Sequence, residues 1–463
     1  MEGDTMLEKL FKLKENGTTL QTELIAGLTT FMTMVYILAL NPAILCAAPG
    51  LENAGGSVLF ATAVASAIAC FCMAAFSNKP FALSAGLGLN AYFAYTVCGA
   101  MGYSWKVALT AVFVEGLIFI VMSLTNIREA IFNAIPKSLK TAVSVGIGFF
   151  ITFIGLQNAH VIVDGSTLVG LFSLKSSLAN GTFASEGITV ILMMIGVVIT
   201  AWLLIKGVKG YMLFGILATW LLGIICELTG LYVPDPANGF YSVIPATLFS
   251  FPDLSVNMIG QFDFGFIGSH FLDFVVILFA FLFVDVFDTL GTVIGCAAKA
   301  DMLDEEGKLP GIKGVLLADA VGTTVGAFLG TSTITTFVES SSGITEGGRT
   351  GLTSVVTGFL FLVSLALAPL FLTIPSFATA PALIVVGFLM MQQVVNINWH
   401  DMAEAIPCFF AITMMGFAYS ISDGIAFGVI SWVVIALLTK RTKDMSPLMY
   451  ILAILFILKY ILI

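Results

Sequence analysis

Apolar residues recur along this chain in runs of about 17 to 25, the length that a helix needs to cross a bilayer. Fourteen such runs fill most of the sequence, and short polar stretches separate them. Hydrophobic residues make up 59% of the chain and charged residues only 10%, whereas a soluble domain carries about 25% charged residues. We therefore expect an all-α polytopic membrane protein. The expected spans are residues 21–46, 57–76, 79–98, 105–123, 138–156, 186–206, 209–229, 265–298, 312–328, 330–347, 349–372, 379–396, 403–419 and 421–439.

The basic residues support this count through their positions, because Lys and Arg concentrate in cytoplasmic loops. If the N-terminus lies in the cytoplasm, only Lys106 and Lys175 fall on the outer side, and the long loop 231–263 contains no basic residue. Both termini are then expected in the cytoplasm, and the chain in the cell (inner) membrane. The last apolar stretch, 447–463, contains Lys459. It is expected to be an interfacial helix, with a fifteenth crossing as the alternative.

Several classes of function find no support in the sequence. The net charge of -9 comes from acidic groups spread over loops, and no basic stripe indicates nucleic acid as a partner. The seven cysteines lack a CxxC spacing and the three histidines lie far apart, so neither a metal site nor a cofactor is expected. The chain also lacks a P-loop and a Ser/His/Asp arrangement, so an enzyme is not expected.

Two carboxylates, Asp285 and Asp288, lie near the middle of the span 265–298. A charge at bilayer depth costs several kcal/mol, so it indicates a substrate or ion site. Residues three apart share a face of a helix, and burial beside a like charge favours a protonated carboxyl. The pair can therefore couple a proton to a ligand. The alternative for Asp288 is a hydrogen bond to a freed backbone group.

Three other acids lie in or beside apolar spans. Glu115 is alone in its span, which favours a hydrogen bond between helices over a functional role. For Asp319, in the sequence LLADAVGTT, the sequence favours neither a structural hydrogen bond nor a functional role over the other. Asp273 lies near the outer end of its span, where a solvated position is expected.

Two of the spans are short and rich in small residues. Residues 80–90 read PFALSAGLGLN and residues 335–345 read TTFVESSSGIT. Each is expected to begin with an extended segment and to continue as a half-helix. Short, Gly-interrupted segments at matching positions of two halves indicate a transporter binding site, and with seven spans per half the second half must be inverted. The alternative, that the glycines only pack helices, is disfavoured by Asn90 and Glu339.

A half-helix that begins at bilayer depth exposes backbone N–H groups at its positive end. Ser340, Ser341 and Ser342 lie where the second half-helix is expected to start, and their N–H groups could donate to a bound molecule. Glu339 could accept from donors of that molecule. Phe337, two residues earlier, is a candidate to stack on a planar ligand.

Four runs of the sequence then point to a known family. They are GLTTFMTMVYILALNP at 27–42, SAGLGLNAYFAYTV at 84–97, FVDVFDTLGT at 283–292 and TSTITTFVESSSGITEGGRTGLTSVVTG at 331–358. These runs resemble the AzgA-like purine-permease branch of the nucleobase/cation symporter-2 superfamily, which includes guanine/hypoxanthine and adenine permeases. The resemblance covers nearly all of residues 20–440.

The resemblance implies an architecture of fourteen spans in two inverted repeats of seven. It implies a core domain moving against a gate domain in an elevator-like step, commonly in a homodimer. On this chain the expected parts are a cytoplasmic tail 1–20, core segments 21–130 and 264–375, gate segments 131–230 and 376–440, the extracytoplasmic loop 231–263, and a basic, interfacial C-terminal segment 441–463.

The resemblance also implies roles for residues. Asp285 and Glu339 are expected to bind the nucleobase and to take part in proton coupling, and Asp288 to serve proton coupling. It also implies a part in transport for Asn90. The other expected substrate contacts, Ser340, Ser341, Phe337 and Gly86, come from the half-helix pattern described above. The implied function is proton-coupled import of hypoxanthine or guanine, with adenine as a further substrate. Sodium coupling is the alternative for the ion. An anion exchanger of the same fold is the alternative function, disfavoured because residues 80–100 and 330–348 contain no Lys or Arg.

Overall fold

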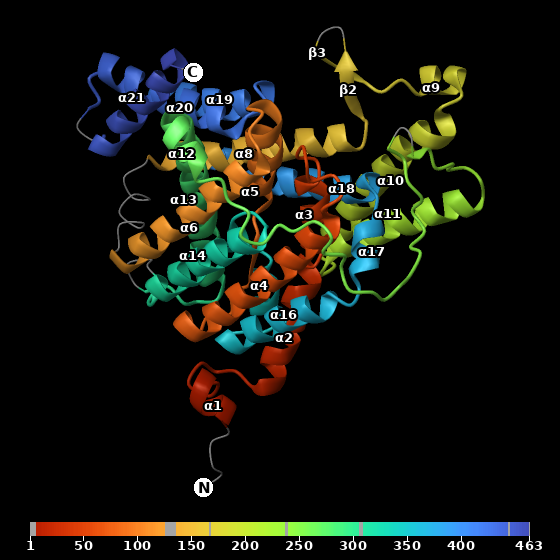
Figure 1. The fold of residues 1–463 in the computed structure, drawn as a ribbon. Helices are drawn as coiled ribbons and strands as arrows, with labels where there is room; N and C mark the ends of the chain where they lie inside the picture. Colours follow the sequence, from red (N-terminus) through yellow and green to blue (C-terminus); the bar gives the residue numbers. More distant parts are fainter. Residues whose placement is uncertain are drawn as a thin grey trace.

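The computed structural model describes residues 6–125, 136–165, 168–236, 239–304, 309–442 and 445–462. Within them the chain forms a stack of helices with two small sheets (Figure 1). The helices up to residue 228 are α1 (Met6–Phe11), α2 (Leu20–Met34), α3 (Ile37–Leu45), α4 (Gly55–Ser77), α5 (Leu87–Ala91), η1 (Tyr92–Ala100), α6 (Trp105–Thr125), α8 (Lys137–Asn158), α9 (Leu174–Asn180), η2 (Phe183–Gly187), α10 (Ile188–Ile205) and α11 (Tyr211–Leu228).

The later helices and the strands complete the described chain. The helices are α12 (Gly265–Ser269), α13 (Phe271–Lys299), α14 (Ile312–Leu329), α15 (Ser340–Thr345), α16 (Gly351–Ser364), α17 (Ala368–Thr373), α18 (Ser376–Met391), η4 (Gln392–Asn396), α19 (Met402–Phe417), α20 (Ile421–Leu438) and α21 (Pro447–Leu462). The strands are β1 (Leu83–Ala85), β2 (Ile162–Gly165), β3 (Leu168–Leu171) and β4 (Ile334–Thr336).

The long helices have the composition of membrane spans. Among the described residues, nine helical stretches are long and apolar enough to cross a bilayer. On α10 the large apolar side chains of Met194, Val198 and Trp202 follow one another at every fourth residue and are more than half exposed. Such a face would cause aggregation in water, but it is the expected surface in lipid.

Two predicted spans contain strands and short helices instead of one long helix. In the span 79–98, β1 leads into α5 and the wide-turned helix η1, and in the span 330–347, β4 leads into α15. The extended segments and half-helices expected from the Gly/Ser-rich runs are thus confirmed. A strand at this depth must find partners for its backbone groups, because lipid offers none.

The two strands supply those partners to each other. β1 pairs antiparallel with β4, with Leu83 opposite Thr336 and Ala85 opposite Ile334. Outside the strands, Gly86 N donates to Thr333 O at 3.0 Å and Phe337 N donates to Ala82 O at 2.9 Å. The first breakpoint of the chain is therefore joined directly to the second.

The long helices pack in two groups, and the strand pair packs against α4, α13 and α14. α4 packs against α14 and α16, α6 packs against α14, and α2 packs against α16 and α15. α8 packs against α18 and α19, and α10 packs against α11 and α18. Figure 1 shows α4, α6, α14 and α16 side by side in the lower part of the view, and α10, α11 and α18 together on the right. The β2–β3 hairpin projects beyond the helices at the top.

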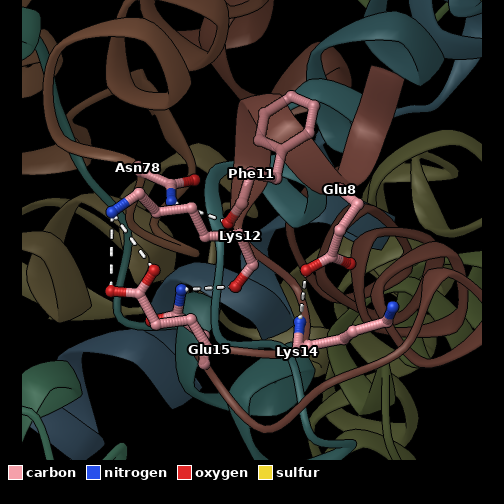
Figure 2. A network of polar contacts seen from close by, with 7 residues as sticks. Glu8, Phe11, Lys12, Lys14, Glu15 and Asn78 are labelled. Carbon is pink, nitrogen blue, oxygen red and sulfur yellow. Dashed lines mark hydrogen bonds and ion pairs between the residues drawn. The ribbon is translucent and has the colours of Figure 1, made fainter. Parts of the chain in front are cut away.

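The N-terminal segment folds against the helices from residue 6 onward. Figure 2 shows Asn78, which ends α4 in a left-handed conformation and donates from Nδ2 to the carbonyl oxygen of Phe11 at 2.9 Å. Oδ1 of Asn78 accepts from Gly351 N at 2.9 Å. Phe11 and Leu13 are buried in one cluster with Ala74. The polar segment predicted at 1–20 is thus anchored to α4 and α16.

The C-terminal segment is helical, as expected. α21 packs against α20 and α13, and the rings of Phe456 and Phe279 meet edge to face at 5.6 Å. The side chain of Lys459, on which the interfacial assignment depends, lies outside the described residues. An interfacial position of this helix stays a prediction.

Candidate functional site

Asp288 lies at the point where the two strands meet α13. Thr335 of β4 donates from Oγ1 to Oδ2 of Asp288 at 3.1 Å. Gly86, which follows β1, approaches the same place: a Cβ there would lie 2.7 Å from Cγ2 of Thr335 and 3.6 Å from Oδ2 of Asp288. Only glycine leaves room for this approach. The structure therefore brings the predicted residues Asp288 and Gly86 together.

Glu339 is the second carboxylate of this junction. It lies at the N-terminal end of α15, three residues after β4, and its side chain is half-buried. The hydroxyl of Tyr36, between α2 and α3, donates to Oε1 of Glu339 at 2.6 Å.

Asp285 does not share the hydrogen-bond partner of Asp288. It is fully buried, and its Oδ1 lies 2.8 Å from Oγ1 of Thr289. The same hydroxyl lies 2.9 Å from Oδ1 of Asp319 on α14, which is also fully buried. A hydroxyl has a single proton to donate, so both contacts are hydrogen bonds only if one carboxyl carries a proton. Asp319, which the sequence left undecided, is thus joined to Asp285.

Asn90 and Ser340 are buried in the packing around the strands. Asn90 accepts a hydrogen bond at Oδ1 from Ser332, and its Nδ2 has no hydrogen-bond partner within the described part of the chain. Oγ of Ser340 accepts from Ala82 N at 3.0 Å, which ties α15 to the segment before β1. The structure does not bring Asn90 into contact with Glu339.

The backbone N–H groups at the start of α15 are engaged within a tight turn. Ser340 N donates to Phe337 O at 3.1 Å, Ser341 N to Val338 O at 3.0 Å, and Ser342 N to Glu339 O at 2.9 Å. The prediction that these groups are free is wrong, because the chain turns back on itself before the helix begins. Phe337 is only 6% exposed and lies in the hydrophobic core, the default position of a phenylalanine.

The segment 331–336, of sequence TSTITT, is a group of functional residues that the sequence prediction does not include. Its hydroxyls reach several helices in turn. Thr331 accepts from Nδ2 of Asn41 at 2.8 Å, Ser332 donates to Asn90, and Thr333 donates to Oε2 of Glu115 at 2.8 Å. The last contact gives Glu115 a hydrogen bond, as predicted, but its partner lies in the segment before β4, where the prediction named another helix. A run of hydroxyl residues in an apolar span was the available signal.

The described residues contain no group of three or more His, Cys, Asp or Glu side chains arranged to hold a metal ion. The arrangement that remains is two carboxylates, Asp288 and Glu339, held by hydroxyl donors. Carboxylates are hydrogen-bond acceptors when ionised. The junction can therefore receive N–H or O–H donors of a ligand.

Solved structures share the fold of this chain. The transmembrane domain of BicA, a bicarbonate transporter of a cyanobacterium, matches with a TM-score of 0.60 at 17% identity, covering 90% of this chain and 96% of that one. SLC26A9 matches with a TM-score of 0.65 at 11% identity, covering 94% of this chain and 67% of that one. At these identities the likeness concerns the fold alone.

Relatives of known sequence align over nearly their whole lengths. A protein of Methanocaldococcus jannaschii described as a permease is 43% identical, over 98% of both chains. The adenine permease AdeP of Escherichia coli is 40% identical, over 99% of this chain and 97% of its own. The guanine/hypoxanthine permease PbuO of Bacillus subtilis is 40% identical, over 97% of this chain and 99% of its own.

A family model described as a permease family, that of the xanthine/uracil permeases, matches residues 21–427. The match includes the two strands, the half-helices and all the acids of the junction. The chain therefore belongs to the xanthine/uracil permease family, whose members are membrane transporters and not enzymes.

Proposed function

We propose that this protein imports purine nucleobases, hypoxanthine and guanine in the first place and adenine as a further substrate. The names of AdeP and PbuO support a purine substrate, since both relatives are 40% identical over almost the whole chain. The membrane in question is the cell (inner) membrane, with both termini in the cytoplasm.

The single observation that carries this proposal is that α13 packs against α15 where each presents a carboxylate held by a hydroxyl donor, Asp288 by Thr335 and Glu339 by Tyr36. A neutral purine presents ring N–H and amino donors, which an ionised carboxylate accepts. Residues 80–100 and 330–348, which include both strands and both half-helices, contain no Lys or Arg. These two segments therefore offer a ligand hydrogen-bond acceptors and no cation. The geometry therefore favours a neutral, donor-rich ligand.

The geometry also suggests a division of roles between the acids. Glu339 and Asp288 accept hydrogen bonds from the purine, with Ser341 as a further contact, and Gly86 lets the end of β1 approach Thr335 and Asp288 closely. Asp285 holds the coupled proton together with Asp319 through Thr289. This division reverses the roles of Asp285 and Asp288 that the family resemblance implies. It is supported by the contact of Asp288 with β4 and of Asp285 with Thr289.

Three predicted contacts take supporting roles in this proposal. Ser340 and Asn90 hold the half-helices to the strands and meet the ligand only if the junction rearranges. Phe337 contributes its ring to the core that surrounds the junction. The first two side chains are fully buried, which supports a structural part in building the site.

Coupling to protons is proposed for the driving force. The hydroxyl of Thr289 lies between two carboxyl oxygens, and a proton on either acid completes the pair of hydrogen bonds. A proton taken up from outside and released inside would make and break this arrangement. Sodium is the alternative, with the same acids as ligands.

The proposed movement is a step of a core domain against a gate domain. The core comprises the elements of 21–130 and 264–375 and the gate those of 131–230 and 376–440, in fourteen spans with inverted repeats of seven, and the protein is a homodimer. The two groups of packed helices support this division. Lipid surrounds the outer faces.

Anion transport is the second candidate, favoured only by the shared fold. BicA carries the name of a bicarbonate transporter, but an anion at the junction would meet two carboxylates. Uptake of sulfate or bicarbonate in place of purines would decide for this candidate.

The test is uptake of labelled hypoxanthine, guanine, adenine, xanthine, uracil and sulfate into cells that lack their own purine permeases. We expect purine uptake that a protonophore abolishes and that persists when sodium is replaced by choline. Cells with the empty vector give the background. Uptake of sulfate without purines would refute the proposed substrate, and dependence on sodium with the proton gradient collapsed would refute proton coupling.

A further inference from the structure

One buried hydroxyl reaches the acid at the half-helix from a distant part of the chain. Tyr36 lies in the apolar stretch Leu20–Leu45, at the step between α2 and α3, and is 2% exposed. Its hydroxyl donates to Oε1 of Glu339 at 2.6 Å, across 303 positions of sequence. A hydrogen bond of this length to a carboxylate belongs to the strong, charge-assisted class.

α2, which ends two residues before Tyr36, packs against the half-helix α15. Gly343 of α15 faces α2 so closely that a Cβ there would lie 2.5 Å from the carbonyl oxygen of Ala26. The carbonyl of Tyr36 itself accepts from Leu40 N at 3.0 Å, and its ring is packed in the hydrophobic core. Neither the backbone nor the ring of Tyr36 is free to turn away from Glu339.

We propose that Tyr36 is a positioning residue that determines which edge of a ligand Glu339 can recognise. This inference rests on the proposed binding of a purine at Glu339. A carboxylate offers about four lone-pair positions on its two oxygens. Tyr36 occupies one of them and thereby fixes the plane of the group. A planar heterocycle must then present its N–H to the remaining positions in one orientation, so methylation at one ring nitrogen is rejected more strongly than at the others.

The contact is tested first without ligand, by a double-mutant cycle of thermal stability. The variants are Tyr36→Phe, Glu339→Gln and the double variant. Tyr36→Phe removes the contact and Glu339→Gln removes its charge assistance, so we expect the double variant to lose less stability than the sum of the two single losses. The control is Tyr232→Phe. Tyr232 is also 2% exposed, and its hydroxyl donates to Tyr241 O at 2.7 Å. The loss of thermal stability in Tyr232→Phe should add to the loss in Glu339→Gln. Additive losses for Tyr36 and Glu339 would overturn the inference.

Recognition is tested next with hypoxanthine and its 1-, 7- and 9-methyl derivatives. In Tyr36→Phe we expect KM for hypoxanthine to rise on the order of tenfold, since a hydrogen bond to a charged group fixes the acceptor. The maximal rate should stay within about twofold. The preference for hypoxanthine over the most strongly rejected methyl derivative should shrink by a similar factor, whereas Tyr232→Phe should keep it.

The outcomes separate this inference from the proposed function. If the unmodified protein neither binds nor carries purines, the proposed function fails, and the stability cycle still decides whether Tyr36 holds Glu339. If the unmodified protein carries purines but Tyr36→Phe keeps its KM and its preference among the methyl derivatives, the positioning role is refuted and the function stands.

Discussion

Glu339 and Asp288 are both held by neutral hydroxyl donors. Tyr36 donates to Glu339 and Thr335 donates to Asp288. The arginine nearest in sequence, Arg349, instead donates from Nη1 to the carbonyl oxygens of Ile344 and Gly348, at the end of α15. A hydroxyl stabilises a carboxylate without cancelling its charge. At the scale of single residues, the junction therefore keeps its acceptors available for a ligand.

Replacement of the half-helix acid should weaken binding without unfolding the protein. Glu339→Gln keeps the shape and can still accept from Tyr36, but it loses the charge. We expect purine affinity to fall by about 1.5 to 3 kcal/mol, the contribution of a hydrogen bond to a charged group. Calorimetric titration of purified protein measures the loss, and Glu52→Gln, at an exposed loop acid, is the control. Unchanged affinity in a folded Glu339→Gln protein would remove Glu339 from the site.

Changing each aspartate of α13 to asparagine should impair a different property of the protein. Asp288→Asn should lose binding, because its amide can present a donor where the ligand needs an acceptor. Asp285→Asn should still bind purine but fail to accumulate it against a gradient, because it cannot carry the proton shared through Thr289. Equilibrium binding and accumulation in vesicles measure the two properties. The opposite pattern would restore the roles that the family resemblance implies.

At the scale of elements, the site depends on how closely β1, β4 and α13 approach one another. Thr335 is the side chain between the strand pair and Asp288, and Gly86 gives it room. Threonine is branched at Cβ and has few alternative rotamers. β1, β4 and α13 can therefore lie this close together only because Gly86 has no Cβ.

Gly86→Ala should consequently disturb the junction. Its Cβ would lie 2.7 Å from Cγ2 of Thr335, and overpacking of this kind costs about 1 to 3 kcal/mol. We expect a lower melting temperature and a loss of purine binding. The matched control is Gly295→Ala on α13, where a Cβ would meet no atom within 4 Å. Equal behaviour of the two variants would show that the close approach is unimportant.

The sequence predicts the elements of this site better than their contacts. The Gly/Ser-rich runs SAGLG and ESSSG indicate both breakpoints, because Gly and Ser disfavour the middle of a long helix. Runs of apolar residues indicate the helices around them. The bond from Tyr36 to Glu339 was not predictable, because no local pattern reports a contact between residues 303 positions apart. The sequence also does not predict that the N–H groups of Ser340 and Ser341 are engaged, because the preceding tight turn has no propensity signal of its own.

At the scale of the whole molecule, the two groups of helices meet at the end of α15. Lys209, before α11, forms an ion pair with Glu346, after α15. If the groups move as core and gate, this contact must break and re-form in each transport cycle.

The ion pair should therefore affect the rate of transport more than affinity. Exposed ion pairs contribute about 0 to 1 kcal/mol, so Lys209→Gln or Glu346→Gln should change the maximal uptake rate by no more than about fivefold. The affinity for purine should stay unchanged. Exchange of the two residues, Lys209→Glu with Glu346→Lys, should restore the rate, and Lys206→Gln is the control. A rate unaffected by all of these changes would mean that the contact does not take part in the cycle.

The pairing of β1 with β4 has a consequence for how the protein is made. Ala82 and Ser340, which flank the two strands and hydrogen-bond to each other, lie 258 positions apart. At about 5 to 20 residues per second of synthesis, the first strand waits tens of seconds for its partner. During that time the backbone N–H and C=O groups of β1 have no hydrogen-bond partners, and lipid cannot supply them. The first half of the nascent chain must therefore remain in the insertion machinery, or at the water interface, until residues 334–336 emerge, and a chain that stops after α11 should be a substrate for membrane quality-control proteases.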